Sequence, residues 1–80
     1  MTNDEHNQLV EDYVREVVGD VIKAGGTFAD VMVVMESVLT GTMLLLVKHF
    51  KIRPDVVAGL VEAAVGKAVE RFKQLEPRLT

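Results

Sequence analysis

Apolar side chains recur every four residues along the first part of the chain. One row consists of Leu9, Tyr13, Val17 and Val21, and a neighbouring row consists of Val10, Val14, Val18 and Ile22. Acidic residues occupy the opposite side, so the pattern predicts an amphipathic helix over about residues 3–24. Thr2 and Glu5 have the spacing of a capping box at its start. Gly25 or Gly26 can adopt the left-handed conformation that commonly ends a helix.

The segment from Thr27 to Val47 is the most apolar part of the chain, and Asp30 and Glu36 are its only charged residues. Thr27 and Asp30 again have the spacing of a helix cap. About 23 residues pass without a turn signal, which exceeds the length of an ordinary strand. We therefore predict a second helix over about residues 27–50.

A third helix is predicted over about residues 54–75, because Pro54 suits the first helical position and Pro77 marks its end. Asp55 lies in its first turn, and basic residues lie near its C-terminus, as the helix dipole favours. Its apolar face consists of Val57, Leu60, Val61, Ala64, Val65, Ala68, Val69 and Phe72.

Short loops join these segments, and short loops make neighbouring helices antiparallel. The fold class is therefore all-α, with three antiparallel helices in a single helical domain over residues 1–80. A variant of this fold has the third helix crossing to a partner chain.

The second helix has more apolar surface than two neighbouring helices cover, because its apolar side chains occupy an arc of roughly 220°. The chain has 80 residues and no cysteine, so association is the remaining way to stabilise so small a domain. We predict a homodimer, with candidate interface residues Val31, Val34, Met35, Val38 and Leu45.

Two other arrangements would also cover this helix. In a monomer, the third helix would cover the whole apolar strip. In a membrane, Glu36 would lie near the bilayer centre at a cost of about 2.5 to 3.5 kcal/mol. The flanking helices are amphipathic and typical of soluble proteins, so we expect no membrane span.

Charge is unevenly distributed along the chain, although the net charge is only −3. Residues 1–47 carry eight acidic and two basic residues, giving −6, and residues 48–80 carry four acidic and seven basic residues, giving +3. The two halves can attract each other, within one chain or between two. The polar, acidic start is unlike a secretory signal, and with no cysteine it indicates a cytoplasmic protein.

The sequence offers no combination of residues typical of an enzyme or of a metal site. His49 has no acidic or histidine partner at helical spacing, and Ser37 lacks the context of a nucleophile. Glu36 is the one acid well inside the apolar segment, where it more simply reaches solvent or pairs with a basic residue. We therefore expect no catalytic, cofactor-binding or metal-binding residues.

Two other groups of residues are candidates for contacts with a partner. Gly59, Ala63 and Gly66 share one side of the third helix, and small residues there would allow close packing. Lys48, Lys51 and Arg53 form the only basic cluster, which is a candidate contact for an anion or a partner. The third helix starts with acidic, apolar and small residues, which lack the polar side chains that read bases, and this argues against DNA recognition.

These observations favour a non-enzymatic homo-oligomeric helical protein that acts as a protein-interaction or regulatory module for an unidentified protein partner. One alternative is a small apolar ligand held between helices near Met32, Met35 and Met43, because methionine suits adaptable pockets. A second alternative is a nucleic-acid-associated regulator that uses the basic loop at residues 48–53.

Overall fold

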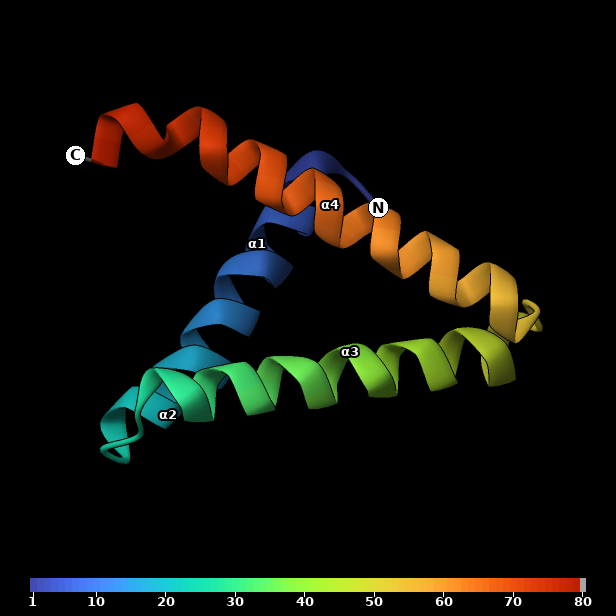
Figure 1. Cartoon of the computed structure of the whole chain (residues 1–80), viewed down its shortest axis with the longest axis horizontal. Coiled ribbons are helices and arrows are strands. Elements are labelled where there is room, and N and C mark those ends of the chain that lie inside the picture. The colour runs from blue at the N-terminus through green and yellow to red at the C-terminus, as the bar shows by residue number, and fades with distance from the viewer. Residues whose placement is uncertain (80) are drawn as a thin grey trace. The chain divides into compact units, whose positions relative to one another are not determined.

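The computed structural model describes residues 1–79, and these residues form helices and short turns without any strand (Figure 1). The helical elements are α1 (Asn3–Tyr13), the π-helical turn η1 (Val14–Val18), α2 (Gly19–Lys23), α3 (Phe28–Phe50) and α4 (Pro54–Leu79). Because α1, η1 and α2 follow one another without a break, residues 1–79 contain three helical stretches. The prediction of an all-α fold is confirmed.

The first helical stretch contains one wide turn that the sequence pattern did not predict. In η1, the N–H of Gly19 donates to the carbonyl of Val14, five residues earlier. Such a turn holds one extra residue and shifts the helix phase by about 100°. In a regular α-helix, a row with four-residue spacing drifts by about 40° per step. The wide turn therefore cancels most of the drift between Leu9 and Val21.

Both predicted helix caps form, and the one at the start of α3 is a reciprocal capping box. The N–H of Glu5 donates to Oγ1 of Thr2 over 3.1 Å at the start of α1. At the start of α3, the N–H of Thr27 donates to Oδ2 of Asp30 over 2.8 Å, and the N–H of Asp30 donates back to Oγ1 of Thr27 over 3.4 Å. These bonds satisfy backbone donors that the first helical turn leaves unpaired, which explains why both helices begin where they do.

The turn between α2 and α3 depends on two glycines with different functions. Gly25 has a φ of +79°, the left-handed conformation predicted for either Gly25 or Gly26. The N–H of Gly25 donates to the carbonyl of Ile22, and the N–H of Gly26 donates to the carbonyl of Val21. This pair of bonds is the Schellman arrangement that ends a helix. Gly26 is needed for space, because an added Cβ would lie 2.6 Å from Cγ1 of Val21.

The turn between α3 and α4 uses a lysine where glycine is commonest. Lys51 follows the last residue of α3 with a φ of +58°. The N–H of Ile52 donates to the carbonyl of Leu46 over 3.4 Å, which closes the helix end. A left-handed conformation costs a residue with a Cβ roughly 1 kcal/mol or more, so this turn is under local strain.

The predicted end of the third helix is wrong, because α4 continues through Pro77 to Leu79. Proline has a φ near that of an α-helix, and inside a helix it costs one N–H donor and a clash of its ring with the carbonyl four residues earlier. The bond lost here is the one to the carbonyl of Lys73. Since Lys73 is exposed, water can satisfy that carbonyl, and the helix continues.

The chain divides into two compact units, Met1–Val38 and Leu39–Thr80, and α3 contributes to both. In the second unit Val57 is only 1% exposed, and it is the one fully buried residue in the part of the chain that the structure describes. Half-buried residues of the same unit are Leu39, Met43, Leu46, Val47, Ile52 and Val61. The hydrophobic core is therefore very small.

Candidate functional site

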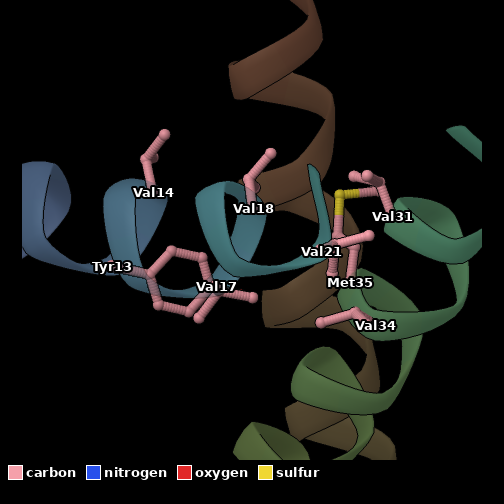
Figure 2. Close-up of a pocket in the computed structure, with 8 residues that line it drawn as sticks. All are labelled: Tyr13, Val14, Val17, Val18, Val21, Val31, Val34 and Met35. Atoms are coloured by element: carbon pink, nitrogen blue, oxygen red, sulfur yellow. The ribbon is translucent and has the colours of Figure 1, made fainter. Parts of the chain in front are cut away.

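An apolar groove lies between the first helical stretch and the beginning of α3 (Figure 2). Its volume is about 190 Å³, and it is lined by Tyr13, Val14, Val17, Val18, Val21, Val31, Val34 and Met35. Figure 2 shows the side chains that line this groove, with those of the first helical stretch and those of α3 meeting near the turn that joins them. The lining comes from both predicted apolar rows of the first helix and from the predicted interface on α3.

The rows extend beyond the groove in the direction of the N-terminus. Leu9 is 56% exposed and Val10 is 61% exposed, although each continues a row that lines the groove. The sequence pattern predicted one long apolar stripe, whereas the structure half-buries only Val17, Val18 and Val21 of its two rows. The rest of the stripe is an apolar surface available for contact.

The structure brings some of the predicted interface residues together and leaves others apart. Val31, Val34 and Met35 line the groove of the first unit, and Val38 is half-buried. Leu45 belongs to the second unit and is 60% exposed. The five residues therefore form no single patch within one unit, and the interface remains a prediction.

The three methionines of the predicted ligand pocket do not share a cavity. Met35 lines the groove of the first unit. Met43 lines a shallow groove of the second unit together with Ala58, Val61, Glu62 and Val65. Met32 lines neither groove and is 48% exposed.

The glycine-rich side of α4 faces open space. A Cβ built on Gly59 or on Gly66 meets no atom within 4 Å, and Ala63 is exposed. The structure thus shows no close packing there within the chain. A partner at this side of α4 remains a prediction.

The basic cluster lies on the surface at the turn between α3 and α4. Lys48, Lys51 and Arg53 are all exposed. Arg53 forms a 3.0 Å ion pair with Asp55 in the first turn of α4, with both side chains largely in solvent. That pair places an acidic group beside the cluster, which reduces its attraction for phosphate.

The titratable residues of the described part do not converge on a site. No three histidine, aspartate or glutamate side chains of residues 1–79 are grouped as metal ligands would be. His49 makes an edge-on contact with Phe50, with ring centroids 4.8 Å apart and an interplanar angle of 84°. The surfaces with the most distinctive character are therefore apolar.

By length and composition alone, α3 could cross a membrane. It has 23 residues, its most apolar window has a mean hydropathy of 1.8, and none of that window is buried. A single helix of this kind is weak evidence for a membrane span, since core helices of soluble proteins have the same composition. Either an apolar environment or other helices would cover it.

Comparison of the chain with protein-family models, with curated proteins and with solved structures finds no match.

Proposed function

We propose that this protein is a non-enzymatic helical module that works as a homo-oligomer, with a twofold dimer as its simplest form. The observation that carries this proposal is the burial of Val57 alone among residues 1–79. A domain with so little core gains little free energy from the hydrophobic effect while it is a monomer. In a dimer, two chains of antiparallel helices would bury apolar side chains against each other and so gain that free energy.

Exposed apolar side chains in each unit support the same proposal. In the first unit Leu9 is 56% and Val10 is 61% exposed, and in the second unit Leu45 is 60% and Phe72 is 56% exposed. Burial of one large apolar side chain contributes about 1.5 to 3 kcal/mol. A dimer interface that covers several of them would supply stability that the small core does not provide.

We favour a role in protein interaction over small-molecule binding. The first groove holds about 190 Å³. Ligand pockets for ordinary small molecules hold about 300 to 1,000 Å³. The groove is therefore better matched to apolar side chains of a protein partner. Native mass spectrometry of freshly purified protein would reveal a retained ligand, and a retained ligand would favour the alternative.

We place the protein in the cytoplasm and outside the membrane. Glu36 lies near the middle of α3, where a charged side chain opposes insertion. Regulation of another protein by contact is the role that such an apolar helical surface supports best. Nucleic acid is a weaker candidate, since the only basic cluster is small and has an acidic neighbour.

Sedimentation equilibrium from about 1 to 100 μM tests the proposal, because a dimer must dissociate on dilution by mass action. We expect a species of twice the 8.8 kDa chain mass, with a melting temperature that rises with concentration. A species of 8.8 kDa throughout this range would overturn the proposal. Flotation with lipid vesicles in the same buffer would reveal membrane association, which is not expected.

A further inference from the structure

Beyond Val61, α4 carries apolar side chains that remain largely in solvent. Val57 is buried and Val61 is half-buried, whereas every described residue after Val61 is exposed. Among the larger of these side chains, Val65 is 42%, Phe72 is 56% and Leu79 is 66% exposed. The second unit therefore buries the beginning of α4 and leaves its C-terminal part without cover.

These apolar residues follow a seven-residue repeat. Intervals of three and four residues alternate through Ala58, Val61, Val65, Ala68, Phe72, Leu75 and Leu79. This alternation is the a and d pattern of a left-handed coiled coil. Gly59 and Gly66 then occupy b positions on the outside, which agrees with the open space around them.

The charged residues beside this row determine how two copies would pair. Arg71 occupies a g position and Glu76 occupies the e position five residues later. In a parallel pair, g of one chain lies beside that e position of the other, so Arg71 meets Glu76 of the second copy twice by symmetry. In an antiparallel pair g lies beside g and e beside e, which would oppose like charges.

We propose that residues 65–79 of α4 pair with the same segment of a second copy as a parallel two-stranded coiled coil. This inference rests on the proposed homo-oligomer and specifies one of its surfaces and its orientation. Two heptads are marginal as an isolated coiled coil. The start of α4 is held in its own unit by the burial of Val57 and Val61. The coiled coil would therefore add to the dimer interface that the other exposed apolar side chains form.

Charge reversal in the full chain tests the orientation. In a homodimer, Arg71→Glu places the introduced glutamate beside Glu76, and Glu76→Arg places the introduced arginine beside Arg71. We expect each variant to dimerise about tenfold more weakly than the natural chain, since two pairs change from attraction to repulsion.

 A mixture of the two variants can form a heterodimer in which the introduced glutamate meets the introduced arginine at one pair, and Arg71 meets Glu76 at the other, so both pairs are attractive. Native mass spectrometry of the mixture should therefore find heterodimers above the proportion expected from random pairing.

A matched control separates this effect from net charge. Lys67→Glu makes the same charge change as Arg71→Glu at a c position, away from the seam. Mixed with Glu76→Arg, it should give pairing close to random. Circular dichroism of each variant should show unchanged helix content, since all three side chains are exposed.

A cysteine variant provides a second measurement. The chain has no cysteine, so Leu75→Cys introduces a single thiol at a d position. A parallel pair places the two thiols side by side, and we expect rapid disulfide formation under mild oxidation. A chain that dimerises but shows random pairing and no rapid cross-link would overturn the coiled coil and leave the homo-oligomer intact. A natural chain that stays monomeric would overturn both.

Discussion

Gly26 and Val21 lie so close together that no side chain fits between them. The N–H of Gly26 donates to the carbonyl oxygen of Val21 over 2.9 Å, and a Cβ on Gly26 would lie 2.8 Å from that oxygen. This contact connects the end of α2 to the start of α3 and so holds the two walls of the first groove together.

Gly26→Ala should lower the free energy of unfolding by about 1 to 3 kcal/mol, because the added methyl must displace backbone. Thermal unfolding at one fixed protein concentration measures this change. Gly25→Ala is the matched comparison, since Gly25 has open space and a φ of +79°. Gly25→Ala should lower the free energy of unfolding by about 1 to 2 kcal/mol, because alanine must then adopt a positive φ. An unchanged melting temperature for Gly26→Ala would mean that the turn relaxes freely.

Asp30→Ala should destabilise the start of α3 by about 0.5 to 2 kcal/mol. The carboxylate accepts bonds from the backbone N–H and the hydroxyl of Thr27, over 2.8 and 3.2 Å, and its charge also suits the helix dipole. Urea unfolding measures the loss. Asp30→Asn keeps an acceptor and removes the charge, so its stability should fall between those of the natural chain and Asp30→Ala. A loss as large as that of Asp30→Ala would show that charge is the whole effect.

Lys51→Gly should raise the free energy of unfolding by about 0.5 to 1 kcal/mol, since glycine adopts a positive φ without the steric cost. Lys51→Ala removes the same charge but keeps a Cβ at a positive φ, so it should not raise the free energy of unfolding. The two melting temperatures, measured side by side, distinguish backbone strain from charge. Equal gains from both variants would assign the effect to the lost lysine.

Val57→Ala should cost about 1.5 to 3 kcal/mol, because it removes two methyl groups from the one fully buried side chain of residues 1–79. Val56, its neighbour in α4, is 44% exposed. Val56→Ala should therefore change stability by less than about 0.5 kcal/mol. Chemical unfolding of both variants measures the difference, and equal losses would contradict a core centred on Val57.

Gly59→Ala and Gly66→Ala should each stabilise α4 by about 0.5 to 1 kcal/mol, because alanine is the better helix former and neither Cβ meets another atom. The melting temperature measures the gain, and sedimentation should show association unchanged. Weaker association of Gly59→Leu with helix content intact would instead reveal a partner packed closely against the glycine side of α4.

Most helix boundaries were predictable because their signals are local. The capping residues Thr2 and Thr27 and the left-handed Gly25 act on groups within a few residues of themselves. The predicted end of the third helix was wrong because proline is a common stop signal. At Pro77 the exposed end of α4 tolerates the loss of one backbone hydrogen bond, and the helix continues. The strict four-residue spacing between Leu9 and Val21 could have indicated the wide turn at η1, since a regular helix does not keep such a row aligned.

Burial and the groove depended on contacts between distant parts of the chain. By itself, the sequence determined an all-α protein with three helical stretches and an excess of apolar surface, because periodicity and caps act locally. Only the tertiary structure decided that Val57 is buried while Leu45 is exposed, and that Tyr13 and Met35 line the same groove. The physical reason is that burial depends on which residues meet across a turn, and the pattern along one helix does not contain that information.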